Sequence, residues 1–366
     1  MNKCPPKKCT VFFELAVVPF YRAKFISQLK SDLADIGNLR ILTGVHSGDG
    51  QVFSDTDISD LYFRNFISLP FGFVWYRGHV IDLFLCDLLV TDKNPRSINV
   101  WLNLLIRRIG GRKTYLWGHS KSRTNNTRFS RLAHHIMNLL ASGIFLYTSE
   151  ESSNVFVKSR KIHVAPNAIM FESECLVGET TNRNNIVYSG RLERSKDLEK
   201  LVGAFILTHL SENGTKLIII GNGSDRERLQ KLVNDGGYAN QIELPGEITD
   251  CASLEKIYAS ARIAIGPGYG GLNITQANCF GVPIIVDKFG KHSPEIALKK
   301  FNGVIMSEFT SIDDLTRSIK IFFEVLDWNI EKRKELAKRV SQVYCISNMA
   351  QAFEKEIRTQ IGRKNV

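Results

Sequence analysis

Three short segments in the second half of the chain combine glycines, cations and amides in an order that suits a phosphorylated ligand. The first, residues 188–198, reads Tyr-Ser-Gly-Arg-Leu-Glu-Arg-Ser-Lys-Asp-Leu, so that Arg191 and Lys196 follow Gly190. A glycine lets the backbone approach a ligand, and two cations at the carboxyl end of a strand can pair with a diphosphate. The alternative is that both cations are solvated loop residues.

The other two segments are glycine-rich turns that follow apolar strands. Residues 217–224 end in Gly221-Asn222-Gly223, a weak dinucleotide fingerprint that a tight strand-to-helix turn explains without a ligand. Residues 266–271 hold four glycines directly before a predicted helix that begins Leu272-Asn273. Gly270 and Gly271 would then cradle a phosphate at the positive end of that helix. Gln276, about one turn inside the helix, could bind a ribose hydroxyl.

These segments lie between short apolar runs that alternate with amphipathic stretches. This alternation is typical of βα units in a parallel sheet, so the sheet would position the segments. In the first half we predict strands at 10–15, 39–43, 88–91, 113–117, 143–148 and 161–165, and helices at 21–33 and 97–108. In the second half we predict strands at 185–189, 216–220, 242–244, 261–265 and 282–286, and helices at 197–209, 225–234, 253–260 and 272–279.

The polar stretch 171–184 carries little apolar pattern and is predicted to link two doubly wound α/β domains, residues 1–170 and 185–329. Residues 330–366 form a charged helical tail with a break near 344–348. We expect the part from 349 onwards to pack on the first domain. The alternative is a tail packed wholly on the second domain.

Length and charge agree with two globular domains and an anionic partner. The chain has 366 residues, 43% of them hydrophobic, and a formal net charge of +11. Such values argue against a disordered, collagenous or coiled-coil protein, and the positive field favours sugar nucleotides, nucleic acid or acidic lipid. Nucleic acid is the weakest of these candidates, because no helix-turn-helix, RNP or zinc pattern accompanies the charge.

The order of the three segments resembles the nucleotide-sugar domain of GT-B glycosyltransferases, family 4 (glycosyl transferases group 1) in particular. The resemblance covers about residues 185–306. It includes Gly-Arg-Leu…Lys at 190–196, Gly-x-Gly at 221–223, Pro245-Gly246-Glu247, Leu254 with Tyr258 and Ala261, and the glycine loop before Gly281-Val282-Pro283. It implies two Rossmann-like domains that face each other across a cleft, with the C-terminal helix crossing back to the N-terminal domain.

One departure from the family concerns its Glu-x7-Glu pattern, whose two positions here are Gly268 and Gln276. The loop instead resembles the Pro-Gly-x-x-Gly-Leu variant of some members, so the acid that usually faces the donor sugar is absent. The resemblance still implies donor binding by Gly190, Gly221, Gly223, Glu247, Gly270, Gly271, Leu272, Asn273 and Gln276.

In the first half the resemblance is thinner. Trp117-Gly118-His119 ends a predicted strand where related enzymes often carry an active-site histidine, which makes His119 a catalytic candidate beside Arg191 and Lys196. Pro19-Phe20-Tyr21-Arg22 follows the first strand where family members place an acceptor-facing loop, so Tyr21 and Arg22, together with Arg123, are the acceptor-binding candidates. Asn167, in the family's Pro-Asn element, is expected to be structural.

No metal or cofactor is expected. Asp55-Thr56-Asp57 looks like a metal-binding Asp-x-Asp, but it lies in a polar stretch, and two carboxylates alone make an incomplete magnesium site. The seven cysteines are scattered, as free thiols in a reducing compartment would be. The sequence shows no secretory signal, and its most apolar stretch, 71–90, is broken by charges.

We therefore predict a cytoplasmic, metal-independent and retaining glycosyltransferase. It would move a sugar from a nucleotide-diphosphate donor to a saccharide or lipid-linked saccharide acceptor in bacterial polysaccharide synthesis, such as lipopolysaccharide or capsule. Basic clusters at 107–108, 112–113, 121–123 and 158–161 suggest peripheral contact with anionic lipid at the inner face of the membrane, and a merely solvated surface is the alternative. The competing functions are a sugar-nucleotide epimerase or hydrolase, and a non-catalytic nucleotide-sugar-binding protein.

Overall fold

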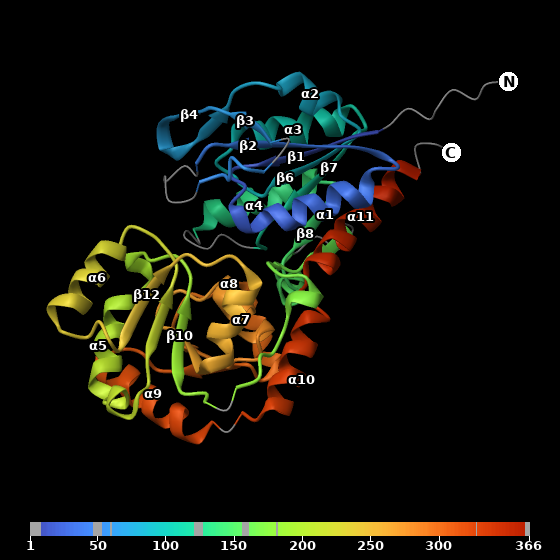
Figure 1. Ribbon diagram of the computed structural model, residues 1–366. Helices are drawn as coiled ribbons and strands as arrows, with labels where there is room; N and C mark the ends of the chain where they lie inside the picture. The colour runs from blue at the N-terminus through green and yellow to red at the C-terminus, as the bar shows by residue number, and fades with distance from the viewer. Residues whose placement is uncertain are drawn as a thin grey trace. The chain divides into compact units, whose positions relative to one another are not determined.

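The computed structural model describes residues 9–46, 53–58, 61–120, 127–155, 161–180, 182–326 and 328–362. The chain divides into two units, and Figure 1 labels their helices and strands. Unit 1 comprises Met1–Pro166 and Ile346–Val366, and unit 2 comprises Asn167–Cys345. The chain therefore passes between the units twice.

Unit 1 is built on a seven-stranded parallel sheet with the strand order β3-β2-β1-β6-β7-β8-β9. Its strands are β1 (Cys9–Leu15), β2 (Gly37–Gly44), β3 (Leu61–Arg64), β6 (Leu88–Asp92), β7 (Lys113–Trp117), β8 (Gly143–Leu146) and β9 (Lys161–Val164). A separate antiparallel pair consists of β4 (Phe66–Ser68) and β5 (Val74–Tyr76). The helices of unit 1 are α1 (Ala23–Leu33), α2 (Val80–Leu85), α3 (Ile98–Ile109), α4 (Arg128–Leu140) and α11 (Ile346–Gly362).

Unit 2 is built on a six-stranded parallel sheet with the order β12-β11-β10-β13-β14-β15. Its strands are β10 (Asn185–Ser189), β11 (Leu217–Ile220), β12 (Ile242–Gly246), β13 (Ala261–Gly266), β14 (Ile284–Asp287) and β15 (Val304–Ser307). Its helices are α5 (Leu198–Thr208), α6 (Arg226–Asp235), α7 (Cys251–Ser260), α8 (Leu272–Cys279), α9 (Ile312–Val325) and α10 (Ile330–Ser341).

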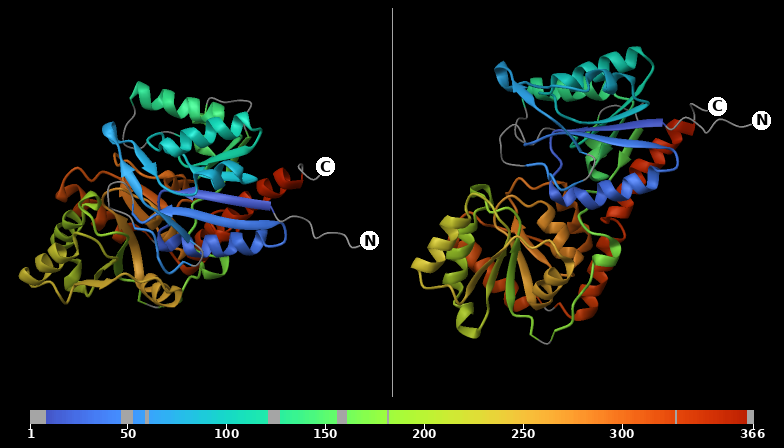
Figure 2. Two further views of the ribbon diagram at one scale, coloured as in Figure 1. Left: turned by 90° about the horizontal axis from the view of Figure 1, so that it is seen from above. Right: turned by 45° about the horizontal axis from the view of Figure 1, so that its top comes forward.

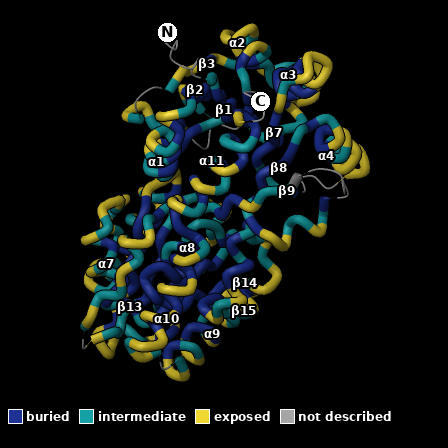
Figure 3. Tube along the Cα trace, turned by 90° about the vertical axis from the view of Figure 1, so that its right-hand side faces the viewer, coloured by how far each residue is buried: buried dark blue, intermediate teal, exposed yellow. Residues whose placement is uncertain are grey.

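Both sheets reverse their order after the first strand, as doubly wound folds do. Chain order runs outward from β1 through β2 and β3 on one side and from β6 on the other, and unit 2 repeats this from β10. The central strands are continuous apolar runs, such as Leu-Ile-Ile-Ile in β11, because helices cover both faces of the sheet. Buried residues follow the strands in Figure 3. The predicted fold class of two Rossmann-like domains is confirmed.

The core of unit 1 contains the buried carboxyl group of Glu14. Glu14, in β1, is 4% exposed and pairs with Arg64 at 3.0 Å (Oε1 to Nη1). Its other oxygen accepts hydrogen bonds from Thr91 Oγ1 at 3.1 Å and Asn103 Nδ2 at 2.8 Å. A buried carboxylate needs such partners, since an unpaired charge would destabilise the fold.

The predicted boundaries need correction. Residues 167–184 group with unit 2 rather than with the first domain or a free linker, because Met170 and Cys175 pack on the core that holds α7 and α8. The tail divides close to the predicted position, at residue 346 rather than 349. α10 stays with unit 2, where Leu336 and Val340 are buried, and only α11 groups with unit 1.

Some elements were absent from the prediction, namely β3, β4, β5, β15, α2, α4 and α9. Among the described residues, no helix is both long enough and apolar enough to cross a lipid bilayer. No disulfide joins any of the six cysteines in the part of the chain that the structure describes.

Candidate functional site

The switch point of unit 2 lies between β10 and β13, where the strand order reverses. Ligands of open α/β sheets bind outside the carboxyl ends of the strands at such a point. The loop after β10 begins at Gly190 and includes the short 3-10 helix Arg194–Lys196. The loop after β13 is the glycine-rich stretch 267–271, which leads into α8. Two of the three predicted segments therefore flank the switch point.

Lys196 joins these two loops. Its Nζ donates a hydrogen bond to Tyr269 O at 2.8 Å and lies 4.6 Å from the centroid of the Tyr269 ring. The backbones also meet closely, since a Cβ on Gly268 would come within 2.5 Å of Ser195 O. Only glycine permits this approach, so the sequence of both loops holds the lysine cation at the glycine-rich turn.

Helix α8 begins directly after the same loop. Gly271 occupies the N-cap position without a side-chain cap, and its own N–H donates to Asn273 Oδ1 at 2.8 Å. The positive end of a helix and its leading N–H groups attract phosphate. Leu272 begins the helix, and Gln276 sits one turn further on, where its Oε1 accepts a hydrogen bond from Ser189 Oγ at 2.6 Å.

His292 is a residue of this loop cluster that the sequence prediction missed. Its Nδ1 accepts a hydrogen bond from Gly270 N at 3.0 Å, so Nε2 carries the proton that it shares with Asp287 O at 2.5 Å. Ser293 N also donates to Gly270 O at 2.9 Å. The hydrogen bond from Gly270 to His292 thus connects the glycine-rich turn to the loop after β14. Its place after a predicted apolar strand was the only available sequence signal.

Arg191 lies at the surface of the site. Its side chain is 52% exposed, and Nη1 is 2.6 Å from Glu193 Oε1. The remaining predicted glycines stand beneath its loop: a Cβ on Gly221 would come within 1.9 Å of Gly190 O, and one on Gly223 within 2.4 Å of Leu192 O. Packing between neighbouring loops alone therefore accounts for these two glycines. Glu247 is exposed, just beyond the end of β12.

In unit 1, His119 lies at the corresponding carboxyl edge, two residues after β7. Its Nδ1 is 3.5 Å from Glu151 Oε1, and its ring centroid is 4.8 Å from that of Tyr147. Desolvation opposes ionisation of Glu151, but hydrogen bonds from His119 and from the backbone N–H groups of Ser120 and Tyr147 outweigh it and lower the pKa of this carboxyl. The ionised Glu151 therefore orients the His119 ring.

The sequence prediction missed two further ionisable groups at this edge. Asp92 is the last residue of β6, and Lys93 follows it. Burial raises the pKa of Asp92 to about 7, and its carboxylate accepts a hydrogen bond from Ala16 N. Burial lowers the pKa of Lys93 to about 8, and its Nζ donates to Ser120 O at 3.1 Å. Perturbed groups of this kind gather at functional sites.

The charge of Lys93 also acts on His134, a residue of α4 that is 8% exposed. Desolvation, and then repulsion by Lys93, lower the pKa of His134 to about 4 from an ordinary 6.5. Between pH 6.5 and pH 4 the unfolded state therefore binds a proton that the folded state does not bind. The contribution of neutral His134 to the free energy of unfolding is therefore fully present above pH 6.5 and is lost as the pH falls towards 4.

We expect protonation of His134 to lower the free energy of unfolding by about 3 kcal/mol between pH 6.5 and pH 4. This value follows from the fall in pKa from 6.5 to about 4, since a change of one in pKa corresponds to about 1.36 kcal/mol. Urea unfolding of wild type and His134→Leu at pH 7 and pH 4.5 measures the difference. The loss on acidification should be smaller in the variant, and an equal loss in both proteins would contradict the assignment.

The three acceptor-binding candidates, Tyr21, Arg22 and Arg123, differ in their exposure and in whether the structure describes them. Arg22 is only 8% exposed, with its Cζ 4.7 Å from the Trp117 ring centroid and Nη1 3.4 Å from Met349 Sδ of α11. This burial corrects the expectation that Arg22 faces an acceptor: it packs beneath α11 instead. Tyr21 is partly exposed and contacts Phe20 edge to face. Arg123 lies outside the described residues.

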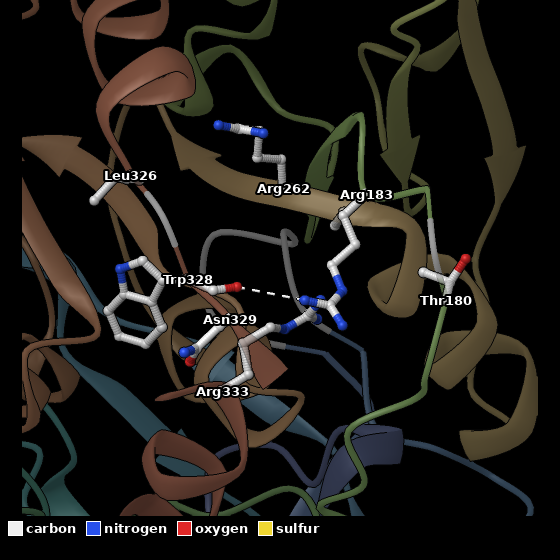
Figure 4. A pocket seen from close by; sticks show the side chains of 8 residues that line it. Thr180, Arg183, Arg262, Leu326, Trp328, Asn329 and Arg333 are labelled. Atoms are coloured by element: carbon white, nitrogen blue, oxygen red, sulfur yellow. Dashed lines mark hydrogen bonds between the residues drawn. The ribbon is translucent and has the colours of Figure 1, made fainter. Parts of the chain in front are cut away.

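A cavity of about 360 Å³ in unit 2 lies away from the switch point, where β13 begins (Figure 4). Arg183, Arg262 and Arg333 line it, together with Trp328 and Asn329. Arg333 donates to backbone carbonyls, at 2.8 Å to Tyr258 O and 3.2 Å to Gly281 O, so its role is to satisfy the ends of packed helices.

The Asp-x-Asp motif at 55–57 is a local turn, in which Asp55 Oδ1 accepts a hydrogen bond from Asp57 N at 3.0 Å. In the described part of the chain, no three His, Cys, Asp or Glu side chains come together as a metal site. Asn167 donates to the buried Glu295 at 2.6 Å, which agrees with its expected structural role.

Part of the chain is similar to known glycosyltransferases. The model of the glycosyl transferases group 1 family matches residues 177–343. The uncharacterized glycosyltransferase MJ1069 of Methanocaldococcus jannaschii is 27% identical over 177 residues, which is 45% of this chain and 44% of that protein. The chain thus matches less than half of this curated relative.

Solved structures resemble the whole chain. Sucrose-phosphate synthase from Thermosynechococcus elongatus has a TM-score of 0.68 at 15% identity, covering 97% of this chain and all of the other. HepE of Anabaena, solved with UDP, has a TM-score of 0.63 at 12% identity, covering 96% of this chain and all of the other. Residues 177–343 thus match the model of the glycosyl transferases group 1 family, and the chain as a whole has the GT-B fold of these solved structures.

Proposed function

We propose that this protein is a retaining glycosyltransferase that needs no metal ion. It moves a sugar from a nucleotide-diphosphate donor to a saccharide or lipid-linked saccharide acceptor, in the synthesis of a bacterial surface polysaccharide such as lipopolysaccharide or capsule. The observation that carries the proposal is Lys196, held by Tyr269 on the glycine-rich turn at the start of α8.

The donor diphosphate would lie at the switch point of unit 2. Lys196 and the leading N–H groups of α8 supply fixed positive charge there, and Arg191 adds an exposed guanidinium. When the sugar–phosphate bond breaks, negative charge develops on the leaving diphosphate, and preorganised cations stabilise it. Gln276 and Asn273, about one turn apart in α8, would bind hydroxyls of the donor.

The acceptor would bind unit 1, at the edge where His119 and Glu151 meet. His119 is assigned a catalytic role and Tyr21 acceptor contact. Arg22 is assigned a positioning role instead, because its side chain is buried between Trp117 and Met349. The relative HepE was solved with UDP, which supports a nucleotide diphosphate as the leaving group.

The test is sugar transfer by the whole chain. A panel of UDP-, GDP- and ADP-sugars is first screened by thermal shift, since a ligand of the native state raises its melting temperature. The stabilising donor is then supplied with oligosaccharide acceptors, and products are identified by mass spectrometry and the anomeric configuration by NMR. Donor turnover without any acceptor would make the protein a hydrolase or epimerase, and donor binding without turnover would make it a binding protein.

Transfer should persist undiminished in excess EDTA, because protein cations occupy the place where a divalent metal would balance the diphosphate charge. The measurement is the initial rate with and without chelator after extensive dialysis. Loss of activity that magnesium or manganese restores would contradict a metal-independent mechanism.

A further inference from the structure

The outer face of α4 is apolar, which is the reverse of what a surface helix of a globular domain normally shows. The buried residues of α4 are His134, Met137 and Asn138. Its large apolar residues face solvent instead: Phe129 is 85% exposed, Leu132 55%, Leu139 44% and Ile136 38%. Their spacing of three, four and three residues places them in one stripe along the helix.

The neighbouring helix α3 continues this surface. Leu105 and Ile106 are exposed, and Ile109 is 87% exposed. Arg108 of α3 donates hydrogen bonds from Nη1 to Leu139 O at 3.2 Å and Leu140 O at 3.3 Å, which joins the ends of the two helices. α3 and α4 run next to each other in Figure 2. We call the seven side chains the α3/α4 face: Leu105, Ile106, Ile109, Phe129, Leu132, Ile136 and Leu139.

Positive charge is concentrated in the stretch of chain that carries the α3/α4 face. Residues 93–149 contain ten Lys or Arg and no Asp or Glu, so this stretch holds nearly all of the net charge of +11. Arg108, Arg128 and Arg131 are exposed on the two helices themselves. An apolar stripe bordered by arginines, without acids, is the pattern of helices that lie in the interface of an anionic bilayer.

We propose that the α3/α4 face docks unit 1 on a membrane rich in acidic phospholipid, with α4 parallel to the bilayer plane. The charge distribution argues against a second copy of the chain, because self-association would bring two such cationic stretches together. The apolar stripe argues against nucleic acid, whose backbone offers it no partner. This surface goes beyond the proposed function, which does not require it, and it is tested without any sugar nucleotide.

The experiment is co-sedimentation of the full chain with vesicles of phosphatidylcholine alone and of phosphatidylcholine with about one third phosphatidylglycerol. We expect binding to the anionic vesicles only, weakened by added salt. Phe129→Ser with Ile136→Ser, and separately Arg128→Glu with Arg131→Glu, should each reduce binding about tenfold or more. Melting temperatures of both variants should match wild type, because the replaced side chains are exposed.

Matched controls come from unit 2. Val325→Ser removes an apolar side chain that is 72% exposed, and Arg317→Glu reverses a cation that is 70% exposed. Neither should change vesicle binding. Wild-type binding by either α4 variant would overturn the proposal. So would equal binding to neutral vesicles, or a concentration-dependent dimer in sedimentation velocity that the Phe129→Ser, Ile136→Ser variant abolishes, since the face would then be a protein interface.

Discussion

Lys196→Ala is expected to lower kcat for sugar transfer by about two to three orders of magnitude, with a much smaller change in KM. The lysine cation stands at the glycine-rich turn, where the leaving diphosphate gains charge in the transition state, so its contribution is greatest there. Steady-state kinetics with the donor identified by thermal shift measure the effect. Arg191→Ala should act in the same direction.

Two variants separate charge from structure at this position. Lys196→Met keeps the alkyl stem against the Tyr269 ring but removes the cation, and should lose as much kcat as Lys196→Ala. Lys216→Ala, a surface lysine of unit 2 paired with Glu243, should leave kcat unchanged. A Lys196→Met enzyme with wild-type kcat would show that the leaving group is stabilised elsewhere.

Phe353→Ala is expected to destabilise unit 1 by about 3–5 kcal/mol. Phe353, in α11, is fully buried, and its ring stacks on Phe145 with centroids 4.1 Å apart. The Trp117 ring centroid lies 5.0 Å away and that of Phe13 5.4 Å away, so truncation would leave a cavity among aromatic rings.

The distribution of tryptophans allows the unfolding of unit 1 to be followed by fluorescence. Of the four tryptophans, only Trp328 belongs to unit 2, so fluorescence in a Trp328→Phe background reports on unit 1 alone. Urea unfolding followed by that signal should show the loss. Phe129→Ala, at a phenylalanine that is 85% exposed in the same unit, is the control and should change the unfolding free energy by less than about 0.5 kcal/mol. A similar midpoint for Phe353→Ala and the control would contradict the assignment of Phe353 to the core of unit 1.

What could be predicted from sequence was local. Strands such as β10 and β13 are short, mostly apolar runs that end at a glycine, and motifs at their ends led to Lys196 and Gln276. A glycine in the sequence is an ambiguous signal. At position 221 any larger residue would collide with the carbonyl oxygen of Gly190, whether or not a phosphate binds nearby. Local pattern thus locates the loops of a site but does not separate ligand contact from loop packing.

What could not be predicted depends on residues far away in the chain. Arg22 reads as a loop cation, but it is covered by Met349, 327 positions later. Lys93 and Asp92 belong to no motif, and only burial at the end of β6 gives them unusual pKa values. His292 stands alone in sequence and gains its partner from the loop after the neighbouring strand.

Residues 346–362 form a helix of unit 1 although all of unit 2 precedes them in the chain, and this order has a consequence for biosynthesis. While the ribosome is still making unit 2, the β1–β8 region already exists, but the aromatic site that Phe353 fills stands open. Apolar surface that waits for a distant segment is prone to aggregation, and such long-range closure slows folding. Chaperone binding during translation should therefore centre on unit 1 and end once α11 has left the ribosome.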